Sequence, residues 1–123
     1  MSRTFFLIAS VYGFFSVAFG AFGAHALKGR LDEYSIGVFR TAVEYQFFHV
    51  FALALVAILI DRYPSELWRW TGLAFTVGVF IFSGSLYLLA LTGVRTWGAI
   101  TPIGGVLLLA GWAMMGLTLL RGN

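Results

Sequence analysis

The sequence predicts an all-α integral membrane protein, a bundle of four transmembrane helices joined by short loops. Of its 123 residues, 60% are hydrophobic and 11% are charged, whereas charged residues make up about 25% of soluble domains. The apolar residues gather into four runs, each close to the roughly 20 residues that a helix needs to cross a bilayer. The runs lack the alternation of barrel strands, so we expect helices that satisfy their own backbone groups within lipid.

The first two predicted spans are separated by a polar stretch. The first span covers residues 5–27 and is closed by Lys28. The second span covers residues 41–60 and follows the polar residues 32–40. It is stopped by two charged residues and then by Pro64, which cannot continue a helix without losing a backbone hydrogen bond.

The third span covers residues 70–91 and the fourth covers residues 98–120, with residues 92–97 between them. Aromatic residues of the kind that gather at membrane interfaces mark the span ends, at Tyr63, Trp68, Trp70 and Trp97. Short connections make consecutive helices antiparallel neighbours, and four crossings place both termini on one side. The whole chain, 1–123, is therefore expected to form a single membrane domain.

Small residues indicate the packing faces, because helices in lipid associate by close backbone approach. The first span carries one stripe of them, Ala9, Gly13, Ser16, Gly20 and Ala24. The third span carries two stripes on opposite faces, Gly72, Thr76, Ser83 and Tyr87 on one and Ala74, Gly78 and Ser85 on the other. We therefore expect the third helix to lie between two neighbours.

The fourth span carries small residues along one side, at Gly98, Pro102, Gly105 and Gly116. Pro102 lacks the amide hydrogen that would bond the carbonyl of Gly98, which predicts a kink near Thr101. We expect these glycines to serve helix packing rather than a ligand site.

The charge pattern favours membrane anchoring. The formal net charge is +3, but the basic residues are scattered singly and form no patch for nucleic acid. They divide evenly between the two membrane faces, and discounting Arg40 as a partner of Glu44 tips the balance toward cytoplasmic termini. We expect a multi-pass bacterial inner (plasma) membrane protein with both termini in the cytoplasm, and a dual topology is left open.

Glu44 is the only Asp, Glu, Lys or Arg within the four predicted spans. An ionisable residue at membrane depth is costly and is by default a functional candidate. In one interpretation Arg40, one turn earlier on the same face, pins Glu44 at the membrane boundary. In the other, Glu44 is desolvated and exchanges a proton for a cation, as in a small drug exporter. We favour the first, because Glu44 lies only about one turn inside the span.

The two histidines are expected at different depths. His49 lies deeper than Glu44 and about 140° around the helix from it, on the face of Tyr45, so a Tyr–His contact is expected. His25, near the end of the first span, is the only other imidazole. A bis-histidine haem needs both ligands at a similar depth, whereas these differ by about 15 Å.

We predict a polar cluster where the first two helices leave the membrane, formed by His25, Arg40 and Glu44. Gln46 is a further candidate for it from elsewhere on the second helix. Such a cluster has the charges to bind a lipid headgroup or a small anion. The alternative is a purely architectural cluster that fixes the helix ends.

Candidate polar groups deeper in the membrane are Gln46, His49, Ser83, Ser85 and Thr101. Hydroxyls at this depth usually bond carbonyls of their own helix, so we expect helix packing here rather than a transport path. The chain contains no cysteine and no recognisable nucleophile with its base, phosphate-binding loop or metal-ligand set. We expect no enzymatic activity, cofactor or metal.

Ordered motifs run through all four spans. They are Gly20-Ala21-Phe22-Gly23-Ala24-His25, Glu44-Tyr45-Gln46 followed by His49, Phe82-Ser83-Gly84-Ser85-Leu86-Tyr87, and Thr101-Pro102 with Gly104-Gly105 and Ala110-Gly111-Trp112-Ala113. With these intervals the chain resembles, over nearly its whole length, the YgdD- and YwdK-like small bacterial inner-membrane proteins, domain of unknown function 423. The resemblance implies a four-helix membrane protein with cytoplasmic termini, and it implies no activity.

The favoured function is therefore that of a non-enzymatic structural, accessory or lipid- and partner-binding membrane protein. The alternative is a small oligomeric transporter or channel that uses Glu44 and His49 and needs a wet cavity shared by both. A b-type haem carrier is the least favoured class. Expected partners are membrane lipid and either a second copy of the chain or a larger membrane complex, and no nucleic acid.

Overall fold

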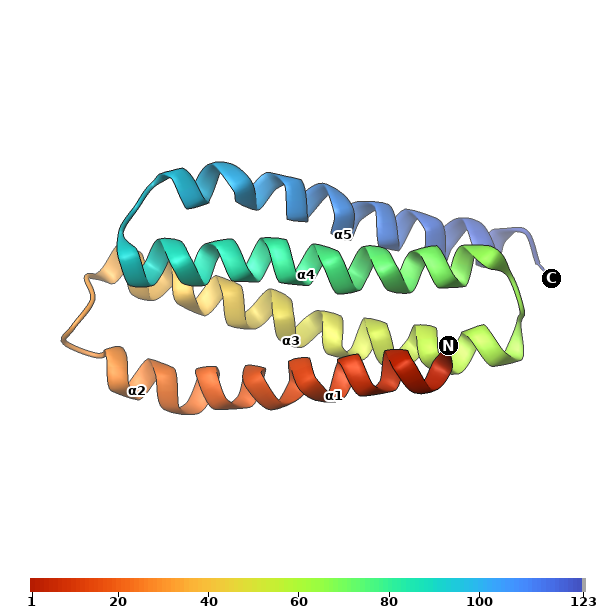
Figure 1. Ribbon diagram of the computed structural model, residues 1–123, viewed down its shortest axis with the longest axis horizontal. Helices are drawn as coiled ribbons and strands as arrows, with labels where there is room; N and C mark the ends of the chain where they lie inside the picture. The colour runs from red at the N-terminus through yellow and green to blue at the C-terminus, as the bar shows by residue number, and fades with distance from the viewer. Residues whose placement is uncertain (123) are drawn as a thin grey trace.

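Four long helices form the computed structural model, which describes residues 1–122 apart from the side chain of Ala24. The elements are α1 (Ser2–Ala18), continued by the π-helical turn η1 (Phe19–Gly23) and α2 (Ala24–Leu27), then α3 (Glu33–Arg62), α4 (Glu66–Thr92) and α5 (Thr96–Leu120). The described residues include no strand, and the four helices are long and apolar enough to cross a membrane. They run antiparallel, with Met1 and the end of α5 at the same end (Figure 1). The predicted fold class is confirmed.

The helices are longer than the predicted spans, because capping residues start them in the polar flanks. Helix α3 begins at Glu33 rather than near residue 41, since the carboxylate of Asp32 accepts a hydrogen bond of 2.8 Å from the backbone N–H of Ser35. Its 30 residues extend over about 45 Å, against a hydrocarbon core of about 30 Å. The first turns of α3 therefore project into the interface.

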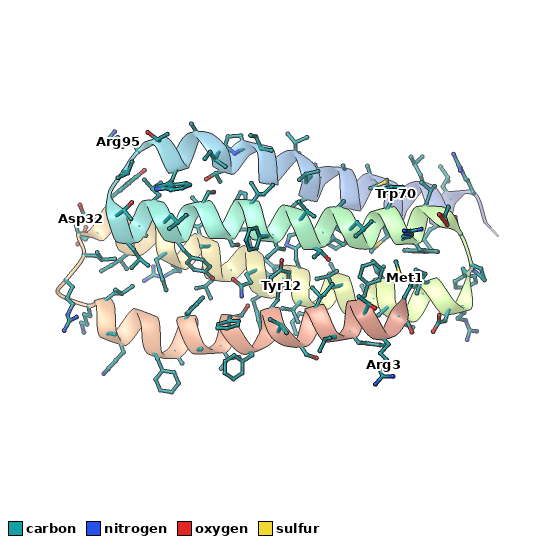
Figure 2. The ribbon with its side chains drawn as sticks, viewed as in Figure 1. Met1, Arg3, Tyr12, Asp32, Trp70 and Arg95 are labelled. Atoms are coloured by element: carbon teal, nitrogen blue, oxygen red, sulfur yellow. The ribbon has the colours of Figure 1, made fainter. Side chains whose placement is uncertain are left out.

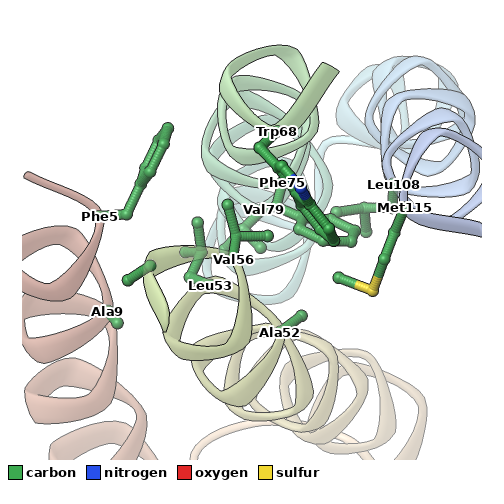
Figure 3. Close-up of a cluster of buried hydrophobic side chains, with 11 residues drawn as sticks. Phe5, Ala9, Ala52, Leu53, Val56, Trp68, Phe75, Val79, Leu108 and Met115 are labelled. Carbon is green, nitrogen blue, oxygen red and sulfur yellow. The ribbon is translucent and has the colours of Figure 1, made fainter. Parts of the chain in front are cut away.

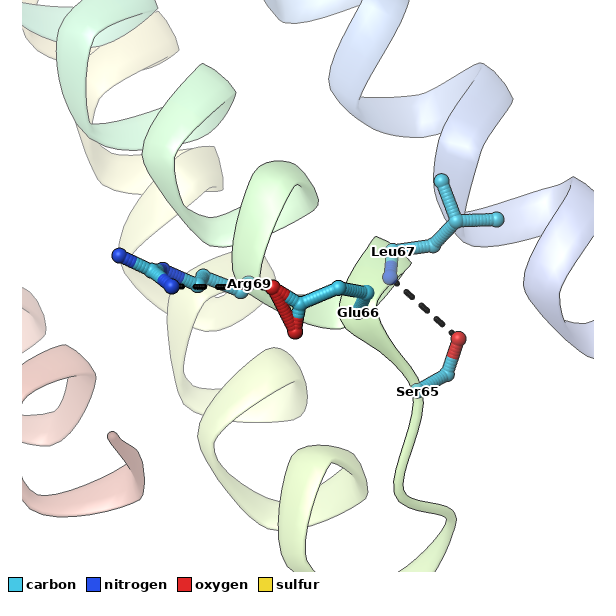
Figure 4. A network of polar contacts seen from close by, with 4 residues as sticks. All are labelled: Ser65, Glu66, Leu67 and Arg69. Atoms are coloured by element: carbon cyan, nitrogen blue, oxygen red, sulfur yellow. Dashed lines mark hydrogen bonds and ion pairs between the residues drawn. The ribbon is translucent and has the colours of Figure 1, made fainter.

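Helix α4 begins in the same way, with the Ser65 hydroxyl accepting from the backbone N–H of Leu67 at 3.3 Å (Figure 4). It ends at Gly93, whose φ of +71° is the left-handed conformation that terminates many helices. An ion pair of 3.6 Å joins Arg69 and Glu66 on the exposed first turns of α4. Charged residues also sit at the opposite end, where Figure 2 shows Asp32 and Arg95.

Helix α4 lies between two neighbours, as its two stripes of small residues indicate. It packs against α5 on one face and against α3 on the other, where Phe5 of α1 also reaches it. Helix α3 in turn packs against α1. An added Cβ at Gly72 would overlap the ring of Phe5 from α1, and one at Gly78 would lie 2.7 Å from Leu108 Cδ2 of α5. On α1, Gly13 faces Val50 of α3. The lack of a side chain at these glycines thus sets how closely the helices approach.

The packing face of α5 differs from the glycine side predicted for it. Gly104 and Gly111 are buried, and an added Cβ would overlap the α4 backbone at Gly104 and would lie 2.6 Å from the Phe75 ring at Gly111. Pro102 and Gly116 are exposed, and α5 runs unbroken through Pro102. The fourth span carries glycines on more than one side. The buried side is the one on which Gly104 and Gly111 alternate with Leu108 and Met115.

The buried core is continuous across all four helices (Figure 3). It comprises Phe5, Ala9, Ala52, Leu53, Val56, Ala57, Trp68, Phe75, Val79, Leu108 and Met115. Trp68 was expected in an interfacial aromatic belt, but it is fully buried in this core, whereas Trp70 is 53% exposed. Near the N-terminus of α4 one indole thus faces the bundle and the other faces outward.

Candidate functional site

A chain of hydrogen bonds joins α1, α3 and α4 around Gln46. The Tyr87 hydroxyl donates to Gln46 Oε1 at 2.7 Å, and Gln46 Nε2 donates to the carbonyl oxygen of Tyr12 at 2.9 Å. The Tyr12 hydroxyl, which points from α1 into the bundle in Figure 2, donates to the carbonyl oxygen of Thr76 at 2.6 Å. Gln46 is 3% exposed, so the amide belongs to this interior chain rather than to the predicted cluster at the helix ends.

Hydroxyl groups on α4 fasten it to both neighbours. Ser83 Oγ donates to the carbonyl oxygen of Ala42 on α3 at 2.7 Å, and Ser85 Oγ lies 2.6 Å from Thr101 Oγ1 on α5. Ser85 and Thr101 also bond carbonyls of their own helices, as expected for hydroxyls in lipid. Ser83 differs because the small Ala42 lets α3 approach closely enough to offer its carbonyl.

His49 is enclosed by contacts that fix its protonation pattern. Its Nε2 accepts a hydrogen bond from the indole Nε1–H of Trp112 at 3.0 Å, so its Nδ1 carries the proton and donates to the carbonyl oxygen of Tyr45 at 2.6 Å. The imidazole is 5% exposed and stacks on the Tyr45 ring with an interplanar angle of 19°. A second proton on Nε2 would face the indole N–H, so the geometry holds the neutral ring.

A hollow opens where the first helix turns through η1 beside α3. It has a volume of about 110 Å³ and is lined by Phe19, Gly20, Leu27, Ile36, Phe39, Arg40, Val43 and Glu44. Six of these residues are apolar or glycine, and the two charged ones, Arg40 and Glu44, are exposed at its edge. Their side chains form no ion pair within 4.0 Å, unlike the Arg69–Glu66 pair of α4.

The π-helical turn shapes this hollow and reorients the residues that follow it. The ring of Phe39 fits against Gly23, where an added Cβ would lie 2.8 Å from Phe39 Cζ. One residue inserted into a helical turn rotates everything after it by about 100°. His25 follows η1, is exposed on α2, and does not line the hollow. The hollow thus holds two of the three residues predicted to cluster.

Three aromatic residues of these networks were not among the predicted site residues: Tyr12, Tyr87 and Trp112. Their polar atoms supply the partners of Gln46 and His49. The available signal was chemical, since a tyrosine hydroxyl or indole N–H within a span needs a hydrogen-bond partner. That rule identifies the donors, but it does not say which acceptor each one meets.

The interior polar groups pair with other protein atoms. Among the residues that the structure describes, no group of three or more His, Cys, Asp or Glu could hold a metal ion. His49 uses both ring nitrogens on protein atoms, and Glu44 is exposed at the hollow. The polar interior therefore joins helices, while the free charges sit at the edge of the hollow.

Comparison with known proteins bears out the resemblance drawn from the motifs. The family model described as "Protein of unknown function (DUF423)" matches residues 19–105. The UPF0382 inner membrane protein YgdD of Escherichia coli K12 is 43% identical over 114 residues, covering 93% of this chain and 87% of that protein. A UPF0382 membrane protein of Staphylococcus haemolyticus is 42% identical and covers 92% of both chains.

A UPF0382 membrane protein of Staphylococcus epidermidis is 40% identical over 119 residues and covers 97% of both chains. No solved structure matches this chain. The relatives are named membrane proteins, and four apolar helices fit a multi-pass protein of the inner membrane. The chain belongs to the DUF423 family of small bacterial inner-membrane proteins, whose function is unknown.

Proposed function

We propose that this protein is a non-enzymatic membrane protein that binds a phospholipid in the hollow between η1 and α3. The observation that carries the proposal is the composition of the hollow: an apolar lining with one cation and one anion at its edge. Phospholipids present the same combination, with apolar chains beside a charged headgroup. Arg40 lies at the start of the predicted second span, which is the depth at which headgroups meet the hydrocarbon core.

The bundle interior supports a fixed scaffold. Gln46, Ser83, Ser85, Thr101 and His49 all have protein partners, and most of these bonds join different helices. A buried polar group that is already paired gains little by moving, because breaking its bond leaves it unsatisfied in lipid. These bonds therefore favour a bundle that keeps one arrangement while its surface binds other molecules.

The transport alternative has less support from the geometry. It requires Glu44 and His49 to share a wet cavity, but Glu44 is exposed at the hollow while His49 is buried against Trp112. Transport remains a prediction that an ion-flux assay in proteoliposomes can test. Proton or cation flux that Glu44→Gln abolishes would overturn the scaffold interpretation.

The binding proposal is tested by filling the hollow. Gly20 lines it, and an added Cβ there would lie 3.4 Å from Val43 Cγ1, so a larger side chain would occupy the space. We expect Gly20→Phe, purified in mild detergent, to retain one phospholipid fewer per chain than the native protein. The matched control is Gly116→Phe, because an added Cβ at Gly116 meets no atom within 4 Å.

Phospholipid per chain is measured by extraction and phosphate analysis, with helicity and size-exclusion profile as checks of folding. Equal lipid content in native protein, Gly20→Phe and Gly116→Phe would overturn the proposal. If Gly20→Phe does not fold, the double variant Arg40→Gln with Glu44→Gln replaces it, since both side chains are exposed. Unchanged lipid content in that variant would equally count against the hollow as the binding site.

A further inference from the structure

Tyr87 joins the hollow to the polar interior of the bundle. Phe19 of η1 and Phe39 of α3 line the hollow, and the ring of Tyr87 from α4 contacts both of them. The Tyr87 ring centroid lies 5.0 Å from that of Phe19 and 5.2 Å from that of Phe39. Because the Phe19 and Phe39 centroids are themselves 6.2 Å apart, the three rings form one cluster from three elements.

We propose that Tyr87 is a positioning residue of the lipid site: its ring holds Phe19 and Phe39 in the arrangement that lines the hollow, and its bond to Gln46 holds the ring. This inference rests on the proposed function, because the hollow is the lipid site named there. It adds that the interior hydrogen-bond chain sets how tightly the hollow binds lipid, although neither Tyr87 nor Gln46 lines it.

The Tyr87 ring is anchored from inside the bundle. Its hydroxyl donates to Gln46 Oε1 at 2.7 Å, and Gln46 Nε2 donates to the carbonyl oxygen of Tyr12 at 2.9 Å. Gln46 is therefore bonded at both amide atoms, to α4 on one side and to α1 on the other. A ring that is held at its hydroxyl by this amide and along its edges by two other rings has little freedom to turn.

The two rings that line the hollow depend on contacts outside their own helices. Phe19 begins the π-helical turn η1, and Phe39 fits against Gly23, the last residue of that turn. The rings of Phe19 and Tyr87 meet edge to face at 70°, a geometry that is favourable beyond the area it buries. Phe39 is 7% exposed, so a change at Tyr87 reaches both rings by direct contact.

The expected effect on lipid binding has a limit. The apparent affinity for a ligand falls in proportion to the fraction of the protein that holds the binding arrangement. One hydrogen bond between membrane helices shifts such an equilibrium by about threefold on average and by about twentyfold at most. We therefore expect Tyr87→Phe, which keeps the ring and removes the hydroxyl, to raise the half-saturating phospholipid concentration by about threefold and by no more than about twentyfold.

The experiment titrates the purified full-length protein in detergent with an equimolar mixture of dioleoyl phosphatidylethanolamine and phosphatidylglycerol, and native mass spectrometry measures the bound lipid. Tyr87→Leu removes the ring contacts as well as the hydroxyl, so it should weaken binding at least as much as Tyr87→Phe. The matched control is Ser85→Ala, which breaks the contact of α4 with Thr101 of α5 and leaves the ring cluster intact. This control should bind lipid as the native protein does.

A second measurement separates positioning from a general loss of stability. Linkage is reciprocal, so bound lipid strengthens the Tyr87–Gln46 bond by the same factor by which the bond strengthens lipid binding. The coupling between Tyr87→Phe and Gln46→Leu in an unfolding cycle should therefore be larger with the lipid mixture than without it. In a Gly20→Phe background, where a side chain fills the hollow, the lipid mixture should leave this coupling unchanged.

Unchanged half-saturation in Tyr87→Phe, or an equal weakening in Ser85→Ala, would overturn the positioning role. If Gly20→Phe alone still loses its bound lipid in that case, the lipid site stands and only its connection to the interior fails. If Gly20→Phe retains its lipid, the proposed function fails as well. Should Tyr87→Leu not fold, Tyr87→Phe and the lipid dependence of the coupling decide the question, because Tyr87→Phe keeps the ring.

Discussion

Replacing Gln46 by leucine removes two interhelical hydrogen bonds at once, one accepted from the Tyr87 hydroxyl and one donated to the carbonyl of Tyr12. Hydrogen bonds between membrane helices contribute about 0.6 kcal/mol on average and at most about 1.7 kcal/mol. Gln46 is 3% exposed and Tyr87 is half-buried, and the lipid around the bundle offers the freed tyrosine hydroxyl no replacement partner. We therefore expect Gln46→Leu to lower the free energy of unfolding by about 1–3 kcal/mol.

The contribution of the Tyr87 bond is isolated by a double-mutant cycle with Tyr87→Phe. Once the hydroxyl is absent, Gln46→Leu no longer breaks that bond, so the double variant should be more stable than the sum of the single losses by about 0.6–1.7 kcal/mol. Unfolding is followed by helicity during titration with a denaturing detergent. The control pairs Gln46→Leu with Thr118→Val, whose hydroxyl bonds its own helix, and should be additive. Additivity in the Tyr87 cycle would refute the bond as a stabilising contact.

Three further predictions concern other parts of the bundle. Gly104→Leu should lower the free energy of unfolding by about 1–3 kcal/mol because its side chain would overlap the α4 backbone, while Gly116→Leu in open space should leave it nearly unchanged; the same detergent titration compares them. The backbone N–H that Asp32 caps holds the pKa of that carboxyl below its ordinary value of 3.8. The carboxylate therefore stabilises the fold above that ordinary value and loses its effect as the pH falls through the lowered pKa, so the stability difference between native protein and Asp32→Ala should shrink below about pH 4. Nitrogen NMR should find His49 as the neutral Nδ1–H tautomer, with Trp112→Phe shifting the Nε2 resonance; an Nε2–H tautomer in the native protein would contradict the assigned bonds.

Sequence patterning predicted the helices well because hydropathy and helix geometry act locally. Each apolar run lies within a helix, and the stripes on the third span identify both faces of α4 that pack. The helix ends were less predictable, because hydropathy marks only the apolar part of each helix. Helices α3 and α4 begin earlier, in polar flanks, where Asp32 and Ser65 cap them. Trp68 shows the same limit of sequence patterning. An aromatic residue near a span end can lie either at the membrane interface or in the core, and Trp68 lies in the core.

The candidate site was harder to predict because it depends on how one helix is rotated against another. His25 was grouped with Arg40 and Glu44 by its depth in the membrane, and depth does not say which way a side chain faces after the π-helical turn over Phe19–Gly23. At this π-turn the ring of Phe39 from α3 packs against Gly23. Periodicity alone carries no signal for it. Arg40 and Glu44 lie one turn apart on the uninterrupted helix α3, as expected, but the ion pair predicted from that spacing is not formed.

In this bundle charged side chains lie at the surface and neutral polar side chains lie in the interior. A search for ionisable residues alone therefore missed most of the interior polar network. Charged groups such as Glu44 and Arg40 remain exposed at the hollow, where keeping a charge costs less than in the bundle interior. Neutral groups such as Gln46, Ser83 and the neutral ring of His49 occupy the interior, because hydrogen bonds satisfy them without the cost of burying a charge. A Gln46→Glu variant tests this division: a charge placed in the interior should destabilise the bundle more than Gln46→Leu does, because a carboxylate must be protonated or solvated there. Equal stability of the two variants would mean that water reaches the interior chain, and the dry scaffold would have to be abandoned in favour of a polar path.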